Sequence, residues 1–161
     1  MKNVISDHKI DKLLGPSGTF AGFSLVIFGI IGLYFSYTIT GLIVIVAGVF
    51  MAFTYEGTII DYTLKKIKSY TCLFGLFKIG EWHGINSFRK FRIYKSNWTY
   101  TSYSRANVEL NLKNSDIRLV LLNDNGSLKI TINKFGSFEE ARKEMTELIK
   151  DLQMTGLKEW V

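Results

Sequence analysis

The sequence predicts a membrane α-hairpin followed by an α+β soluble domain. The 43 residues from Leu13 to Tyr55 contain no Asp, Glu, Lys, Arg or His, and such a stretch can cross a bilayer core of about 30 Å twice at about 1.5 Å per helical residue. After it, the hydrophobic pattern changes to the two-residue period of strands. One amphipathic helical pattern follows near the end of the chain. We therefore expect two transmembrane helices, then a bent antiparallel sheet of about seven strands with one C-terminal helix.

The charge distribution gives the expected division of the chain. Up to Glu56, three lysines balance three acidic residues, so the net charge of +6 comes from the rest, where 17 basic residues face 11 acidic ones. We expect a cytoplasmic N-terminal tail over 1–14, the hairpin over 15–56, the soluble domain over 57–154 and a C-terminal tail over 155–161. The basic excess suits a domain beside an anionic lipid surface.

The hairpin is expected to consist of spans at about Thr19–Tyr37 and Ile39–Tyr55. Its connector, about 36–40, carries no lysine, whereas both outer flanks do. By the positive-inside rule, this pattern predicts a multi-pass protein of the cell (cytoplasmic or inner) membrane with both termini in the cytoplasm. A cleaved signal peptide is disfavoured because a second apolar segment follows at once. The flanking lysines are Lys2, Lys9 and Lys12 before the hairpin and Lys65, Lys66 and Lys68 after it.

Small residues recur along the hairpin at a spacing that suits helix packing. Gly22, Gly29 and Ser36 are seven residues apart, and Gly41 and Gly48 repeat that spacing in the second span. Such a stripe lets two helices approach closely in lipid. We expect it to close the hairpin on itself, and the alternative is a homo-oligomer contact. Neither span contains an ionisable residue, which argues against a transporter or pump.

The soluble domain shows strand patterns and one clear helix start. Strands are expected at about 58–64, 66–73, 76–82, 88–95, 97–103, 108–113, 117–123 and 128–133, with a hairpin turn at 123–126, where Asn-Gly favours positive φ. Ser137 and Glu140 form a capping box that opens the helix, and Gly156 is expected to end it. The expected buried face of this helix comprises Phe138, Ala141, Met145, Leu148, Ile149 and Leu152.

The order of about seven strands and a closing helix resembles the pleckstrin-homology-like (PH-like) superfold. Gly57–Asp61, Lys65–Lys68 and Phe74–Trp82 are similar to the opening of bacterial membrane-anchored PH-like proteins, which place such a domain after a two-helix hairpin. The resemblance covers nearly the whole chain and implies a module that binds lipids, peptides or proteins. It supplies no catalytic motif, and no phosphoinositide-binding signature maps onto these residues.

Two basic clusters are the candidate binding sites. Lys65, Lys66 and Lys68 lie about ten residues beyond the hairpin, at the first expected strand turn, and could hold the domain against an anionic leaflet. In the second cluster, strand alternation puts Lys90, Arg92 and Tyr94 on one face and Phe91 and Ile93 on the other. That face suits lipid or an acidic peptide. For both clusters the alternative is an ordinary solvated strand surface.

Other functions find little support in the sequence. Nucleic-acid binding is disfavoured because Phe91 is expected to point away from the charges. Trp98, Tyr100 and Tyr103 form an aromatic group that suits either a partner surface or packing. His83 is the only histidine after the hairpin and Cys72 the only cysteine, so we expect no metal site and no cofactor.

The sequence thus predicts a non-enzymatic membrane protein whose cytoplasmic module binds a protein partner or an anionic lipid surface. The alternative is a structural subunit that docks to a larger membrane complex through the glycine stripe.

Overall fold

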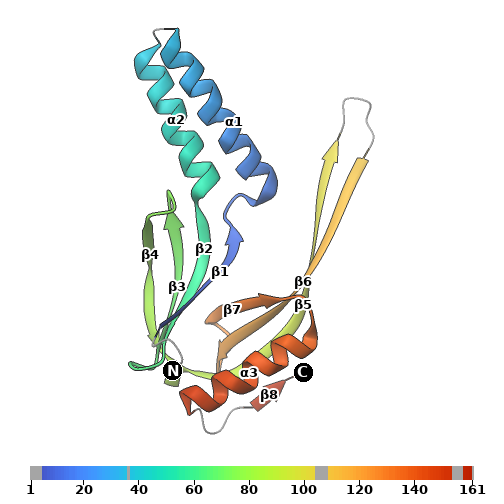
Figure 1. Ribbon diagram of the computed structural model, residues 1–161. Helices are drawn as coiled ribbons and strands as arrows, with labels where there is room; N and C mark the ends of the chain where they lie inside the picture. The colour runs from blue at the N-terminus through green and yellow to red at the C-terminus, as the bar shows by residue number, and fades with distance from the viewer. Residues whose placement is uncertain (1–4, 36, 104–108, 154–157, 161) are drawn as a thin grey trace. The chain divides into compact units, whose positions relative to one another are not determined.

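The protein is described by a computed structural model over residues 5–35, 37–103, 109–153 and 158–160, and side chains are described for these residues except 98–103, 109–114 and 158–160. The chain forms an α+β fold with three α-helices and two separate sheets (Figure 1). It divides into two compact units, Met1–His83 and Gly84–Val161. The domain boundary expected at residue 57 was placed at the end of the apolar stretch. Contacts within the chain instead group the first four strands with the helical hairpin.

The first unit contains the predicted apolar helical hairpin. Helix α1 spans Gly15–Tyr34 and α2 spans Thr38–Phe53. Only α1, with 20 residues, is long and apolar enough to be a candidate membrane span among the described helices. The expected second span, Ile39–Tyr55, was too long: α2 has 16 residues because the chain turns extended at Thr54 and enters a strand.

The glycine stripe lies between the two helices. A Cβ atom added to Gly22 would lie 2.8 Å from the carbonyl oxygen of Gly48, and one added to Gly29 would lie 2.9 Å from that of Gly41. All four glycines are buried, so the helices meet backbone to backbone along this line. The stripe therefore packs within the hairpin. Ser36, the fifth member of the predicted stripe, lies outside the described residues.

A four-stranded antiparallel sheet continues directly from the hairpin. Its order is β1 (Ile5–Lys12), β2 (Tyr55–Asp61), β3 (Lys66–Leu73) and β4 (Phe77–Gly84). Strand β1 corrects the expectation of an N-terminal tail over 1–14, because it enters α1 and pairs with the strand that leaves α2. Helix pair and strand pair thus form one antiparallel structure, β1-α1-α2-β2.

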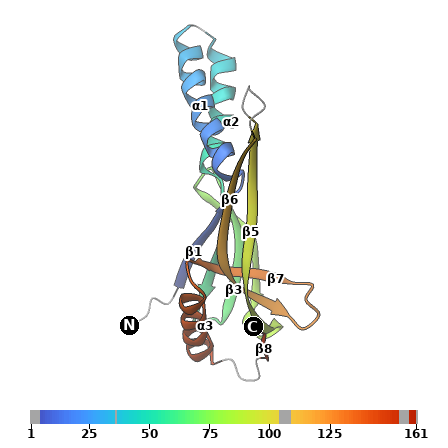
Figure 2. The same cartoon turned by 90° about the vertical axis from the view of Figure 1, so that its right-hand side faces the viewer.

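The second unit contains the other sheet and the C-terminal helix. After a 3-10 turn, η1 (Ile85–Ser87), the chain forms β5 (Phe88–Tyr103), β6 (Glu109–Asn123), β7 (Lys129–Phe135), α3 (Phe138–Leu152) and β8 (Lys158–Trp160). The sheet order is β7-β6-β5-β8, with β8 parallel to β5. The β5–β6 ribbon continues well past the parts that β7 and β8 cover (Figure 2).

Several expectations for this unit were wrong in detail. The four strands expected between 88 and 123 are two long ones, since the pairing of β5 with β6 runs without a break from Lys90 to Tyr103. Residues 158–160 form β8 where a C-terminal tail was expected. The turn at 123–126 is confirmed: Gly126 has φ of 68° and donates its N–H to the Asn123 carbonyl at 2.9 Å.

Helix α3 begins as predicted and ends earlier. The Glu140 N–H donates to Ser137 Oγ at 3.2 Å, which confirms Ser137 as the N-cap. The helix stops at Leu152 because Gln153 adopts a left-handed conformation with φ of 50°, so Gly156 is not its end. The buried face consists of Ala141, Met145, Leu148 and Leu152, whereas Phe138 is half exposed.

Replacement of Gly48 by Ala tests the helix contact. The new Cβ would lie 2.7 Å from the Gly22 carbonyl oxygen and 2.8 Å from the Val26 nitrogen, both backbone atoms that cannot rotate away. We expect a loss of about 1–3 kcal/mol in the free energy of unfolding, measured by SDS titration of the purified protein in micelles. Gly32→Ala is the control, because its Cβ would meet no atom closer than 3.6 Å. A change of oligomeric state in Gly48→Ala without loss of stability would instead place the stripe between molecules.

Candidate functional site

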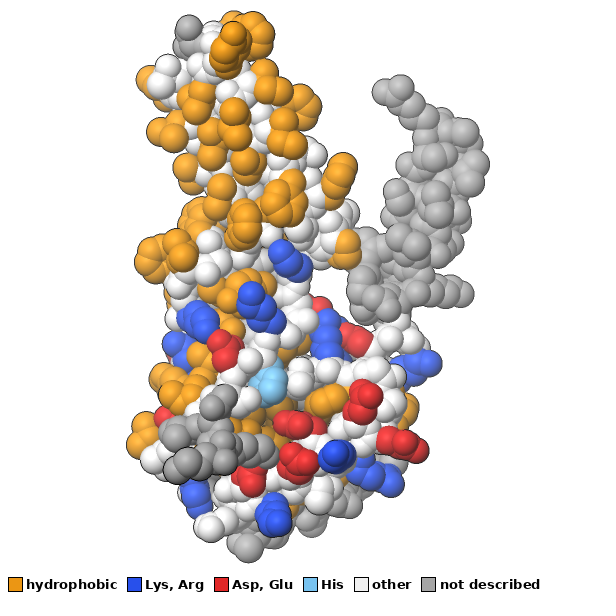
Figure 3. Space-filling model, viewed as in Figure 1, with side chains coloured by type: hydrophobic (Ala, Val, Ile, Leu, Met, Phe, Trp, Pro, Cys, Tyr) orange, Lys and Arg blue, Asp and Glu red, His pale blue; other side chains and the backbone are white. Residues whose placement is uncertain are grey.

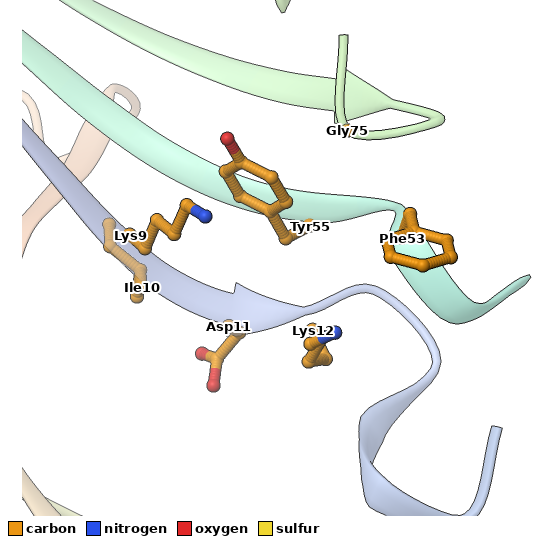
Figure 4. Close-up of a pocket in the computed structure, with 7 residues that line it drawn as sticks. All are labelled: Lys9, Ile10, Asp11, Lys12, Phe53, Tyr55 and Gly75. Atoms are coloured by element: carbon orange, nitrogen blue, oxygen red, sulfur yellow. The ribbon is translucent and has the colours of Figure 1, made fainter. Parts of the chain in front are cut away.

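A pocket of about 300 Å³ lies at the base of the hairpin, within the first unit (Figure 4). It is formed where β1 runs into α1, where α2 runs into β2, and where the β3–β4 turn passes the end of α2. We call it the base pocket. Its lining residues are Lys9, Ile10, Asp11, Lys12, Phe53, Tyr55 and Gly75.

Two lysines and one carboxylate give the base pocket its charge. The register of β1 against β2 shifts between Lys9 and Asp11, and such a bulge resets the alternation of side chains. Figure 4 shows the Asp11 carboxylate directed away from Lys9 and Tyr55. The Lys9 ammonium lies 4.2 Å from the centroid of the Tyr55 ring, and Lys12 Nζ donates to the Ala52 carbonyl at 2.9 Å. Lys12 thus caps the carbonyl end of α2, where a cation is favoured.

The Tyr55 side chain links the base pocket to the buried middle of the sheet. Its ring packs edge-on against Tyr70 at 6.3 Å between centroids, and it stands opposite the fully buried Cys72 in the β2–β3 ladder. The hydrogen bond with the Cys72 thiol, together with burial, raises the pKa of Tyr55 to about 12. Tyr55 is therefore a neutral phenol at physiological pH, and suits a contact surface better than an acid–base role.

A polar network ties three strands of the sheet together. The Tyr70 hydroxyl on β3 donates to Asp7 on β1 at 2.6 Å, and Lys78 on β4 forms an ion pair with the same carboxylate. Tyr70 reaches across β2 because Gly57 has no side chain there; an added Cβ would lie 2.5 Å from the Tyr70 hydroxyl. Burial alone would raise the pKa of Asp7, but the hydrogen bonds from Lys78 and Tyr70 outweigh it and hold the pKa below its ordinary value.

The β3–β4 turn places apolar side chains beside the end of α2. Phe74 and Gly75 have φ of 55° and 72°, and the Leu76 N–H donates to the Leu73 carbonyl at 3.0 Å, as in a tight hairpin turn. Positive φ costs a bulky residue roughly 1 kcal/mol. Phe74 is held there by its ring contact with Phe50 of α2, 5.4 Å between centroids, and by its N–H donating to Thr54 Oγ1.

The surface of the first unit changes from apolar to charged where the hairpin meets the sheet. Apolar side chains cover the hairpin, and the first Lys or Arg side chains come into view at its base (Figure 3). Five exposed apolar residues lie where the hairpin meets the sheet, and we call them the collar. They are Leu13, Leu14, Phe53, Leu76 and Phe77.

The first predicted lysine cluster is spread along β3, away from the base pocket. Lys65 and Lys66 stand at the β2–β3 turn, since Lys66 pairs with Asp61 at the end of β2 that is farther from the hairpin. That end is about 20 Å from Tyr55 at 3.4 Å per residue. Lys68 lies midway, with Nζ 3.3 Å from the Lys78 carbonyl oxygen and 5.8 Å from the centroid of the Trp82 ring.

The second predicted cluster belongs to the second unit. Lys90 and Arg92 line a groove of about 440 Å³ beside the 123–126 turn, and Lys90 Nζ donates to the Asp124 carbonyl at 3.0 Å. Tyr94 does not line this groove; its hydroxyl accepts from Lys129 at 3.1 Å. Phe91 is buried and also lines this groove, although strand alternation was expected to place it on the face opposite Lys90 and Arg92.

Metal-binding and aromatic candidates add no further site. Among the described residues, no three His, Cys, Asp or Glu side chains come close enough to hold a metal ion. The side chains of Trp98, Tyr100 and Tyr103 lie outside the part of the chain whose side chains are described.

Sequence reasoning missed the base pocket as a site. It treated Lys9 and Lys12 only as topology signals and placed both in a tail. No local pattern in Ile5–Lys12 could have found them, because its two apolar residues, Ile5 and Ile10, do not alternate with polar ones, and the pairing with β2 is seen only in the structure.

Comparison with known proteins leaves the site to be interpreted from its own geometry. No protein-family model, curated protein or solved structure matches the chain.

Replacement of Asp7 by Asn tests the network across the sheet. Because the pKa of Asp7 is lowered in the folded state, its stabilising effect is present above about pH 4, the pKa of a free Asp, and is lost as the pH falls below it. We expect Asp7→Asn to lower the melting temperature at pH 7 by a few degrees at most, since the pair is partly exposed, and to match the wild type near pH 2.

The matched control is Asp124→Asn, which removes an exposed carboxylate paired with Arg89 at 3.5 Å. Equal effects of the two substitutions at pH 7, or an Asp7→Asn deficit that persists in acid, would contradict the proposed role of the network.

Proposed function

We propose that this protein is a two-span integral membrane protein, with both termini in the cytoplasm, that presents a non-enzymatic binding module at the membrane surface. The observation that carries the proposal is the hairpin itself: two helices without a charged residue, closed by glycines, with their large apolar side chains facing outward. Such a surface is far larger than the apolar patches that ordinary soluble proteins expose to water. Lipid is the solvent that suits it.

The short α2 is compatible with a second crossing. Its 16 residues measure about 24 Å, roughly 6 Å less than the hydrocarbon core. The collar continues the apolar surface beyond the end of α2, and a small mismatch costs only fractions of a kcal/mol per Å. The lysines on both outer flanks and the uncharged connector support cytoplasmic termini.

The base pocket supports anionic lipid as one ligand of the module. Lys9 and Lys12 stand at the end of α2, where lipid head groups would lie if the hairpin crosses the membrane. Lys65 and Lys66 stand about 20 Å farther along the sheet, beyond the Debye length of about 8 Å at physiological ionic strength. We therefore assign the lipid contact to Lys9 and Lys12 in place of the cluster at 65–68.

A protein partner fits the groove at Lys90 and Arg92 on the second unit. The order of strands before α3 supports a PH-like binding module, whereas the division of those strands between two sheets differs from the single bent sheet that this resemblance implies. A structural subunit docked through the glycine stripe receives less support, because Gly22, Gly29, Gly41 and Gly48 are already buried in the hairpin.

Cysteine labelling of intact cells tests the two-span topology. With both spans inserted, Thr38→Cys lies outside and reacts with a membrane-impermeant maleimide, whereas Glu139→Cys on α3 reacts only after permeabilisation. Native Cys72 is fully buried and contributes no background. If α1 alone crossed the membrane, the two positions would lie on the same side and label together.

Replacement of Lys9 by Gln tests the lipid contact. A lysine beside an anionic surface contributes about 1 kcal/mol, so we expect roughly a fivefold loss of preference for phosphatidylglycerol over phosphatidylcholine. The measurement is native mass spectrometry of lipids retained by the full chain from mixed vesicles. Lys66→Gln removes the same charge from another exposed strand position and should change the preference little. Equal losses in both variants would contradict a specific lipid contact at Lys9 and would indicate a general effect of net charge.

A further inference from the structure

The turns of the described β-hairpins differ in their chemistry. At the β2–β3 turn, the Asp61 carboxylate accepts hydrogen bonds from the N–H groups of Thr63 and Leu64, at 2.9 and 2.8 Å. The β6–β7 turn reads Asn-Asp-Asn-Gly. Both are closed by the Asp or Asn-Gly chemistry usual for turns in water, although the β2–β3 turn also exposes one apolar residue, Leu64.

The β3–β4 turn is different, because it consists of apolar residues throughout. It reads Leu73-Phe-Gly-Leu-Phe77, and Leu76 and Phe77 are 77% and 63% exposed. A tight turn with positive φ at both central positions normally carries Asn-Gly, yet here an aromatic residue takes the first of them. Packing against Phe50 accounts for Phe74, but neither turn formation nor the protein core accounts for the exposed Leu76 and Phe77.

The position of the β3–β4 turn is fixed against the end of α2. The Phe74 ring contacts Phe50, its N–H donates to Thr54, and the Cβ position of Gly75 lies 3.5 Å from Phe53 Cβ. The turn therefore lies level with the last turn of the helix, within one compact unit. If α2 begins at the far interface, its shortfall of about 6 Å places this level about 6 Å inside the cytoplasmic boundary of the hydrocarbon.

We propose that the β3–β4 turn, with Leu76 and Phe77 at its tip, inserts into the cytoplasmic boundary of the bilayer as a third membrane contact beside α1 and α2. Its occupant is lipid, at the depth where acyl chains meet head groups. This proposal rests on the proposed function, because it takes the depth of the turn from a membrane-spanning hairpin. Apolar side chains at this depth add buried area to the anchor.

Environment-sensitive labels on three matched positions test the insertion. Leu76→Cys, Phe28→Cys on α1 and Leu64→Cys at the β2–β3 turn replace apolar residues that are 77%, 67% and 64% exposed, so none of the labels displaces a buried side chain. The full chain is labelled with a nitrobenzoxadiazole fluorophore and reconstituted in phosphatidylcholine–phosphatidylglycerol vesicles. Quenchers are aqueous iodide, a nitroxide near the top of the acyl chain and a nitroxide near its end.

We expect the label at 76 to be quenched most by the shallow nitroxide and to be several-fold less accessible to iodide than the label at 64. The label at 28 should be quenched most by the deep nitroxide. The proposal is overturned if 28 responds to lipid while 76 behaves like 64. It is also overturned if 76 is shielded from iodide and from both nitroxides, since a protein surface then covers the turn. No lipid quenching at 28 would instead defeat the membrane anchor, and the insertion with it.

Discussion

The close contact between Gly22 and Gly48, and between Gly29 and Gly41, is the constraint on which the first unit depends. Helices with ordinary side chains pack 8–10 Å apart, whereas the two strands that continue them must approach to about 4.8 Å. Glycine at the contact narrows this difference, so that β1 and β2 can pair directly below the helices, from Lys12 opposite Tyr55 onward. A hairpin with larger residues at these positions would force the strands apart at their first pair.

The base pocket is a consequence of the pairing between β1 and β2. Because β1 lies beside the start of β2, Lys12 reaches the Ala52 carbonyl at the end of α2, and Lys9 reaches the Tyr55 ring. Pairing of β1 also brings Asp7 within reach of Tyr70, across the gap that Gly57 leaves in β2. The residues that set the charge of the pocket therefore come from a segment before the helices, and they depend on the hairpin being closed.

The sequence was sufficient for elements whose signal is local. The absence of charge predicted the helical hairpin, and Ser137 with Glu140 predicted the start of α3. Strand β1 was missed because its pairing with β2 joins residues about fifty positions apart and its apolar residues are few. The strand patterns on either side placed Lys65 and Lys66 at the first strand turn, and the β2–β3 register confirms that place. The end of α3 at Gln153 was missed because a non-glycine residue takes the left-handed position.

The chain thus distributes two kinds of contact over its two units. In the first unit, glycines allow the two helices to pack closely, and the hydrogen bond between Tyr70 and Asp7 joins the strands. The apolar residues of the collar lie where the helices end. These features all suit a fixed position relative to lipid. The groove at Lys90 and Arg92 belongs to the second unit, where the Lys90 ammonium donates to the Asp124 carbonyl of the neighbouring turn. Under the proposed function, the contact with lipid and the contact with a protein partner thus depend on residues of different units.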